Sequence, residues 1–178
     1  MLKDDILVGV AGSVMAAIVG ITGINGKALP VDEKENNIMV QASAVETPEK
    51  IKNKYENSVS LTDSQLRELL MAVGFEGEAL KMAWAVAKKE SNGSPLAFNG
   101  NKKTGDHSFG LFQINMNGSL MQDRIKKFNL NSASDLFNPV RNAEIAYHMS
   151  NGGKNWSSWT QLSGVRMKTF LSDYSQAY

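Results

Sequence analysis

The sequence predicts a mainly α fold that contains a small irregular or β-hairpin region and is preceded by a hydrophobic N-terminal helix. Three observations lead to this fold class. Residues 1–26 are almost purely apolar, residues 27–60 are polar and irregular, and from Leu61 onward apolar residues recur with helical spacing. We therefore expect a hydrophobic helix over residues 1–26, a polar linker over residues 27–60, and a domain over residues 61–178 that is long enough to bury its own core.

The N-terminal segment has no charged residue from position 6 to position 24, a run of 19 residues. As a helix, this run is about 28 Å long and just spans a hydrocarbon core of about 30 Å. Three interpretations stay open: a membrane-inserting helix, a helix buried against other proteins of an assembly, and a signal peptide, which Asp4 and Asp5 disfavour. Small residues that would share one helix face favour a homo-oligomer or contact with other helices: Gly12, Ala16 and Gly20.

Composition narrows the classes of function. The formal net charge is +1, and the domain has 13 Lys and Arg against 10 Asp and Glu, so we expect no nucleic-acid sequence recognition. The chain has no cysteine, which excludes disulfides, thiolate metal ligands and a thiol nucleophile. Its two histidines, His107 and His148, are 41 positions apart and lack the close spacing of a helical zinc motif. We expect no metal and no cofactor.

The predicted domain begins with two amphipathic helices, although residues 48–57 of the linker also have some helical character. The first helix starts at an N-cap, Thr62 or Asp63, and ends at Gly74. The second spans about residues 76–89, and Glu90 lies at its C-terminal edge. Residues with helical spacing form the apolar faces of the two helices: Leu66, Leu69, Leu70 and Val73, then Leu80, Ala83, Trp84 and Ala87.

The remaining elements are a loop and three helices. Residues 91–106 are rich in Asn, Gly, Lys and Ser and predict a loop or a short hairpin of the kind that lines a cleft, whereas the conformation of residues 109–115 stays open. A short helix is expected around residues 121–128. Asn138 and Pro139 form an N-cap and first-turn pair for a helix that runs to about Asn151, and residues 167–174 predict the last helix.

Glu90 is the candidate for acid chemistry. Cleavage of a glycosidic bond needs a carboxylic acid that keeps its proton near neutral pH and gives it to the leaving oxygen. The partial negative charge at a helix C-terminus disfavours a carboxylate, and an apolar wall such as Trp84 or Phe109 would exclude water. A lone glutamate beside Lys88 and Lys89 is more often a surface residue, so the assignment depends on the motifs around it.

Four ordered segments carry a resemblance to a known family. They are Ala87-Lys88-Lys89-Glu90-Ser91-Asn92-Gly93, Gly105-Asp106-His107-Ser108-Phe109-Gly110-Leu111-Phe112-Gln113-Ile114-Asn115, Leu136-Phe137-Asn138-Pro139 with Asn142-Ala143 and Ala146-Tyr147, and Trp156-Ser157-Ser158-Trp159. Together they resemble the lysozyme-like lytic transglycosylase superfamily, closest to bacteriophage virion-associated lysozyme-like domains. The resemblance implies an α+β lysozyme-like fold and cleavage of the peptidoglycan β-1,4 bond between N-acetylmuramic acid and N-acetylglucosamine.

The resemblance also implies roles for single residues. Glu90 matches the catalytic glutamate, and Ser91 matches the serine that orients it or the substrate. Gln113 matches the glutamine of the Gly-Leu-x-Gln-Ile motif, whose amide suits N-acetyl groups and sugar hydroxyls. The expected substrate-binding residues are Ser91, Gln113, Asn115 and Tyr147.

Three further residues have two interpretations each. Asp106 is the possible second carboxylate, which would hold an attacking water, or it is a bystander on the loop beside His107. Trp156 and Trp159 would stack on sugar rings or complete the core, and we favour the core for Trp159.

The resemblance has one departure that bears on the product. Many lytic transglycosylases carry an Ala-Tyr-Asn-x-Gly motif late in the domain, where this sequence has the segment from Trp156 to Trp159. A transglycosylase leaves a 1,6-anhydro sugar by using the substrate's own C6 hydroxyl, and a hydrolase admits water, usually with a second carboxylate. The lack of a certain partner carboxylate for Glu90 favours the transglycosylase.

The resemblance suggests a setting. The protein would belong to a phage virion and open the wall during DNA entry, acting in the host periplasm or cell envelope, with possible membrane insertion through residues 6–24 and contacts to other virion proteins. One alternative is a bacterial enzyme anchored in the inner membrane, facing the periplasm and serving a secretion or conjugation machine. Another is a structural or channel-forming virion protein whose domain binds glycan but is inactive.

Overall fold

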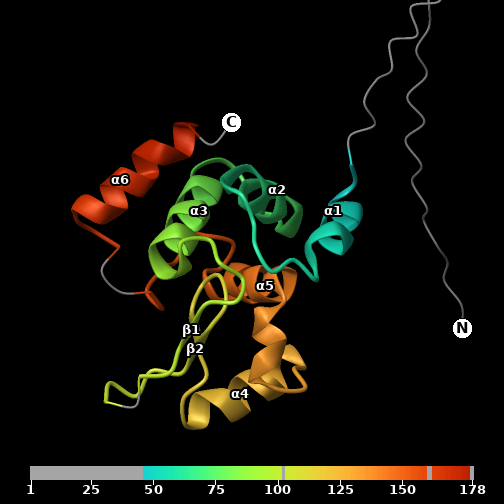
Figure 1. Ribbon diagram of the computed structural model, residues 1–178, viewed down its shortest axis with the longest axis vertical. Coiled ribbons are helices and arrows are strands. Elements are labelled where there is room, and N and C mark those ends of the chain that lie inside the picture. Colours follow the sequence, from blue (N-terminus) through green and yellow to red (C-terminus); the bar gives the residue numbers. More distant parts are fainter. Residues whose placement is uncertain (1–45, 102, 160–161, 177–178) are drawn as a thin grey trace, which may run out of the picture. The chain divides into compact units, whose positions relative to one another are not determined.

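The computed structural model describes residues 46–101, 103–159 and 162–176, which form six α-helices, two 3-10 helices and a three-stranded sheet (Figure 1). In chain order the elements are α1 (Pro48–Tyr55), α2 (Asp63–Val73), α3 (Gly77–Ser91), β1 (Phe98–Asn99), β2 (Ser108–Phe109), β3 (Ile114–Asn115), α4 (Ser119–Phe128), η1 (Ala133–Phe137), α5 (Pro139–Met149), α6 (Val165–Asp173) and η2 (Tyr174–Gln176). The mainly α fold with a small hairpin region is thus confirmed.

The predicted N-terminal helix lies outside the described residues. Among the helices that the structure does describe, none combines the length and apolar character needed to cross a membrane.

Capping residues set both ends of α2, and Asn92 ends α3. The Thr62 hydroxyl accepts a hydrogen bond from the Gln65 N–H at 3.2 Å, and the Gln65 side chain accepts one from the Thr62 N–H at 2.8 Å, forming a capping box. Gly74 ends α2 with a left-handed φ of 114°. Helix α3 runs two residues beyond the predicted end, so Glu90 lies within its last turn.

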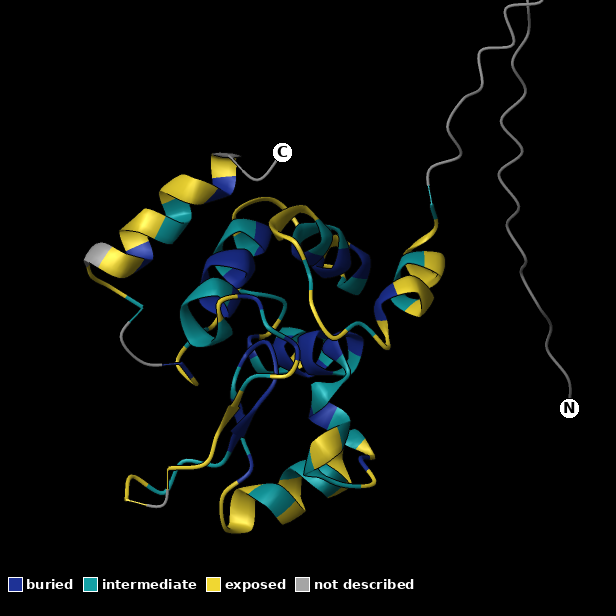
Figure 2. Cartoon of the chain, in the orientation of Figure 1, coloured by how far each residue is buried: buried dark blue, intermediate teal, exposed yellow. Residues whose placement is uncertain are grey.

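The core lies between α2, α3, α5 and the turn that follows β2. Helix α3 is buried on nearly every side from Ala83 to Ala87, as the dark blue ribbon in Figure 2 shows. Helix α4 contributes only partly buried side chains, whereas Leu136 of η1 is fully buried. The catalytic candidate therefore extends from a helix whose central turns are buried in the core.

The three strands form an antiparallel sheet in the order β1-β2-β3. Phe98 pairs with Phe109, and Phe109 pairs with Ile114. The sequence left the conformation of residues 109–115 open. In the structure, residues 110–113 form a tight turn between β2 and β3. The segment between β1 and β2 extends from the body of the domain and is largely exposed (Figure 2).

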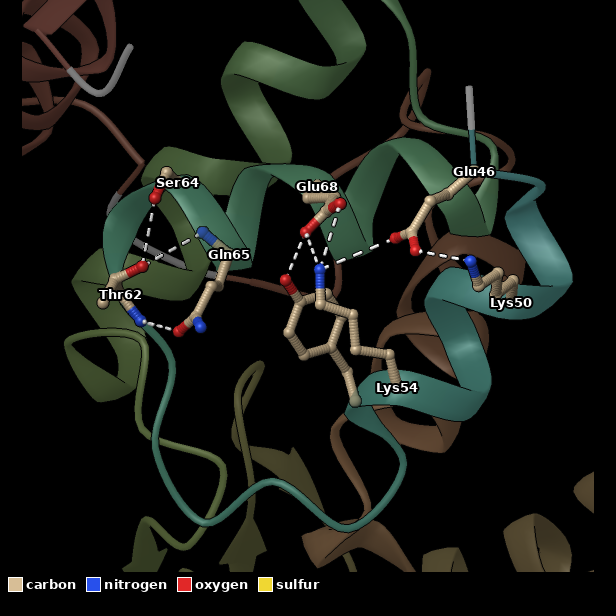
Figure 3. Close-up of polar contacts among 8 residues, drawn as sticks. Glu46, Lys50, Lys54, Thr62, Ser64, Gln65 and Glu68 are labelled. Atoms are coloured by element: carbon tan, nitrogen blue, oxygen red, sulfur yellow. Dashed lines mark hydrogen bonds and ion pairs between the residues drawn. The ribbon is translucent and has the colours of Figure 1, made fainter. Parts of the chain in front are cut away.

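Helix α1 lies in the stretch predicted as linker. Tyr55 is only 3% exposed, because its ring packs into the core, and its hydroxyl donates a hydrogen bond to Glu68 of α2 (Figure 3). Lys54 Nζ lies 3.2 Å from a Glu68 oxygen and 3.7 Å from a Glu46 oxygen. Charged residues in the stretch predicted as a polar linker therefore attach α1 to α2.

This attachment perturbs several titrating groups. The Tyr55 hydroxyl and Glu68 raise the pKa of the Lys54 ammonium above its ordinary value. Burial, with a further contribution from the bond to Glu68, raises the pKa of the Tyr55 hydroxyl. At the surface, hydrogen bonding by Lys50 is the main cause that lowers the pKa of Glu46.

Candidate active site

Glu90 lies in the last turn of α3, just before two residues with left-handed backbone end the helix. Asn92 adopts a left-handed conformation with φ of 56°, and its N–H bonds the carbonyls of Ala87 and Lys88. Gly93 follows with φ of 76° and donates to the Ala87 carbonyl at 3.3 Å. This arrangement ends the helix within two residues of Glu90 and leaves its side chain about 21% exposed, open to a ligand on one side.

The two lysines that precede Glu90 pair with different carboxylates. Lys88 reaches back to α2, where its Nζ lies 2.8 Å from an Asp63 carboxylate oxygen. Lys89 Nζ lies 2.7 Å from Glu90 Oε1, and both side chains of this pair are about one-fifth exposed. Glu90 Oε2 has no hydrogen-bond partner within the described part of the chain, so this oxygen is the one open to a substrate.

Trp84 does not supply the apolar wall expected beside Glu90. Its indole N–H donates to the Asp63 carbonyl at 3.1 Å, and its ring meets Tyr174 edge-on at 5.7 Å. These contacts direct Trp84 toward α2 and η2.

Ser91 joins the end of α3 to the turn between β2 and β3. Its hydroxyl lies 2.8 Å from the Leu111 carbonyl oxygen and 3.0 Å from that of Ala87. One hydroxyl carries one proton, so Ser91 donates to one of these carbonyls at a time. The contact joins the last turn of α3, which carries Glu90, to the turn between β2 and β3.

Gln113 lies in that same turn. Its backbone has a left-handed φ of 47°, uncommon for a residue other than glycine. Its side-chain amide donates to the carbonyl of Ala97 at 3.1 Å and to that of Gly110 at 3.0 Å. Both amide hydrogens are thus engaged, and only the side-chain oxygen stays available as an acceptor for a ligand.

Asn142 belongs to one of the four resembling segments, but the sequence predicted no site role for it. It is fully buried on α5, where its oxygen accepts from the Phe112 N–H at 2.9 Å. Its amide donates to the carbonyls of Phe109 and Leu136, both at 2.9 Å. Three backbone groups around the turn are satisfied by this one side chain, which makes Asn142 the internal support of the turn.

Gly110 permits this support. A Cβ at this position would lie 2.3 Å from Asn142 Nδ2 and 2.3 Å from the Leu136 carbonyl oxygen, and the φ of 72° also favours glycine. Trp159 closes the turn from the other side, because its indole N–H donates to the Phe112 carbonyl at 2.8 Å. Trp159 is 8% exposed, which confirms its prediction as core.

The other three predicted site residues make no hydrogen bond or ion pair with Glu90 among the described residues. Asn115 on β3 accepts a hydrogen bond from the Asn117 N–H at 2.8 Å. Asp106 lies on the β1–β2 hairpin, where the Thr104 hydroxyl donates to its Oδ2 at 2.5 Å. Tyr147 packs edge-on against Phe75, with the ring centres 4.9 Å apart, next to the start of α3. Glu90 lies near the other end of this helix, and the two ends are about 20 Å apart.

The described residues contain no cluster of three or more His, Asp or Glu side chains arranged to hold a metal ion.

A family profile described as Lysozyme like domain matches residues 67–161, just over half of the chain. The chain belongs to this family. A search of curated proteins and a search of solved structures each returned no match. Membership indicates peptidoglycan-related glycosidase or transglycosylase activity, with peptidoglycan as the bound substrate, and the matched region contains the whole Glu90 corner.

Proposed function

We propose that this lysozyme-like domain cleaves peptidoglycan glycan strands at the β-1,4 bond between N-acetylmuramic acid and N-acetylglucosamine, as a lytic transglycosylase with Glu90 as its acid. The observation that carries the proposal is the placement of Glu90. It lies in the last turn of the buried helix α3, partly exposed, and Ser91 joins this turn to the segment around Gln113. A catalytic acid needs such a rigid base and an open side.

In the proposed reaction, Glu90 gives its proton to the glycosidic oxygen as the bond from that oxygen to C1 of the muramic acid breaks. The Glu90 carboxylate then takes the proton of the C6 hydroxyl on the same sugar, whose oxygen bonds to C1. The product is a 1,6-anhydro sugar, and Glu90 regains its proton. Glu90 would use Oε2 for both proton transfers, because Lys89 Nζ lies 2.7 Å from Oε1.

We further propose that Gln113 and Asn115 contact the sugar next to the bond. Gln113 would accept a hydrogen bond from a sugar hydroxyl or an N-acetyl N–H through its remaining side-chain oxygen. Tyr147, if it binds glycan, would contact a sugar distant from the bond at Glu90. Asp106 as a base that holds water would convert the reaction into hydrolysis.

The setting that we propose is a phage virion that opens the host wall during DNA entry, with residues 6–24 as a membrane-inserting segment. The resemblance of the four ordered motifs supports it. An inner-membrane anchored bacterial enzyme would use the same chemistry, and the genes beside this one separate the two settings.

A glycan-binding domain without turnover is the second candidate, and the Lys89 ion pair favours it. An ammonium 2.7 Å from Oε1 competes with any substrate group for the Glu90 carboxyl. This candidate predicts glycan affinity without released product.

Digestion of purified peptidoglycan, with mass spectrometry of the released sugars, tests the proposal. Wild type should release anhydro ends, and Glu90→Gln should be slower by about 10²- to 10⁴-fold. Glu78→Gln is the matched control, because Glu78 is an exposed glutamate in the first turn of the same helix. Reducing ends would identify a hydrolase. An active Glu90→Gln protein would refute the assignment, and binding without release would favour the second candidate.

A further inference from the structure

A cavity of about 430 Å³ lies on the β1–β2 hairpin, and the proposed reaction makes no use of it. Its volume falls in the range of small-molecule sites in proteins. The residues that line it come from both sides of the hairpin and from the segment after β3: Phe98, Gly100, Gly105, Asp106, His107 and Asn117.

Phe98 presents a fixed and exposed aromatic ring in this cavity. The residue is 54% exposed, although it is a large apolar side chain. Its ring lies 4.9 Å from that of Phe109 and 5.5 Å edge-on from that of His107. Two ring carbons also lie 2.7 and 2.8 Å from where a Cβ at Gly100 would be, so only glycine leaves room for the ring there. The ring is therefore held in place without being covered.

Polar atoms that no described residue hydrogen-bonds lie around the ring. Thr104 bonds only one carboxylate oxygen of Asp106. The side-chain amide of Asn117 makes no hydrogen bond to any residue that the structure describes. Gly105, with φ of 72°, has no Cβ, and one there would lie 3.1 Å from the Asn117 amide nitrogen. The cavity thus offers a free acceptor, and a free donor and acceptor pair, beside an apolar surface.

A pyranose ring has complementary features, because its C–H groups form an apolar face and its hydroxyls form a polar edge. An aromatic face attracts the C–H groups, and carboxylate and amide groups bind hydroxyls or an N-acetyl amide. We propose that this cavity is a subsite for one N-acetylated sugar ring of the glycan strand, with Phe98 as its stacking platform and with Asp106 and Asn117 as its polar contacts.

The position of the cavity fits a long substrate. Phe98 pairs with Phe109, and Leu111, two residues further on, contacts Ser91 beside Glu90. This path limits the separation from Glu90 to about 20 Å, which is within reach of a sugar next to or beyond the one being cleaved. The inference rests on the proposed function for its substrate class, and it adds a binding determinant that the catalytic assignment does not require.

The competing explanation is structural: the rings of Phe98, His107 and Phe109 would stabilise only the hairpin. Three substitutions separate the two. Phe98→Ala removes the ring, Phe98→Leu keeps apolar bulk without a stacking face, and Phe98→Tyr keeps the face. Leu96→Ala is the matched control, because Leu96 is 50% exposed, close in sequence and outside the cavity.

Each variant is titrated with chitotetraose in the full-length Glu90→Gln protein, with NMR detection of the His107 ring protons in every variant and of the Phe98 ring protons where Phe98 is retained. In the Glu90→Gln parent we expect shifts of both rings. Binding should be about tenfold weaker for Phe98→Ala and Phe98→Leu, and close to the parent for Phe98→Tyr and Leu96→Ala. In the active protein, KM for peptidoglycan should rise about tenfold in Phe98→Ala, with kcat within about twofold. Unchanged binding in both Phe98→Ala and Phe98→Leu overturns the proposal, as does full recovery by Phe98→Leu.

The titration needs no cleavage. If wild type proves inactive but chitotetraose binds at Phe98, the subsite stands and the proposed function fails. If cleavage depends on Glu90 but the Phe98 variants behave like Leu96→Ala, the proposed function stands and the subsite fails.

Discussion

The Glu90 corner, which comprises the end of α3 at Glu90 and Ser91 and the turn of residues 110–113, is held by polar side chains, as is helix α1. The two regions differ in how these side chains act. At the corner, the fully buried amide of Asn142 and the indole of Trp159 bond backbone groups. At α1, charged groups such as Lys54 and Glu46 pair near the surface, and only Tyr55 is buried.

The buried hydrogen bonds and the surface ion pairs constrain the structure to different degrees. A buried amide that satisfies three backbone groups specifies one geometry, and its loss leaves those groups without partners. Surface ion pairs are screened by water and salt and contribute little each. The corner should therefore respond to substitution with large effects, and α1 with small ones.

The largest effect is expected for Gly110→Ala. The added methyl group would collide with Asn142 Nδ2 and the Leu136 carbonyl at 2.3 Å, in a backbone conformation that disfavours alanine. We expect a loss of about 4 kcal/mol in the free energy of unfolding, measured by urea denaturation. Gly118→Ala is the control, because Gly118 also has a positive φ but nothing within 4 Å, and it should lose about 1 kcal/mol. Equal losses would show that the support by Asn142 is not tight.

Asn142→Leu should come next. The substitution keeps the volume but leaves the Phe112 N–H and two carbonyls without partners, so we expect a loss of about 3 kcal/mol in unfolding free energy. Asn142→Asp retains the acceptor and should lose less of the Phe112 contact. Asn57→Ala at the exposed end of α1 should change little. A stable Asn142→Leu protein with normal peptidoglycan digestion would contradict the role of the corner.

Ser91→Ala should have a smaller effect, because it removes one hydroxyl that two carbonyls share. We expect a loss of about 1 kcal/mol in stability and a kcat about fivefold lower at similar KM, since Glu90 would be less well placed. Ser91→Thr should restore part of the kcat, and Ser94→Ala serves as the control. A rise in KM alone would mean that Ser91 binds substrate instead.

Tyr55→Phe tests the buried part of the α1 attachment. The folded-state pKa of Tyr55 is raised, so its stabilising contribution is present below the ordinary value of 10.0 and is lost as pH rises through the folded value. The wild-type Tm should therefore fall above about pH 10, and Tyr55→Phe should fall less steeply. Glu68→Gln should reproduce part of this change. Identical alkaline profiles for wild type and Tyr55→Phe would exclude this titration as a cause.

The smallest effect is expected for Glu46→Gln. The folded-state pKa of Glu46 is lowered, so its contribution is present above the ordinary value of 4.5 and is lost as pH falls through the folded value. Hydrogen-exchange protection of α1 should decrease in wild type at pH values below 4.5, and Glu46→Gln should show a weaker acid dependence. Glu49→Gln in the same helix is the control. Loss of protection in the control alone would contradict the role of Glu46.

The sequence predicted the helices around Glu90 well. Thr62 is the N-cap of α2, Gly74 ends α2, and Glu90 lies in the last turn of α3, because local capping and apolar spacing decide these features. The helix α1 was only partly predicted. Its packing depends on Tyr55 and on ion pairs to residues far along the chain, and neither has a local signature.

By itself, the sequence determined the helical class, the hairpin region and the motifs that mark Glu90, since these depend on short-range patterns. The tertiary structure decided which polar residues act together. Asn142 is 30 residues from Phe112, whose N–H it binds, and Tyr147 lies near the opposite end of α3 from Glu90. A buried hydrogen bond and a long-range contact depend on where elements pack, and the order of residues along the chain does not encode that in any local pattern.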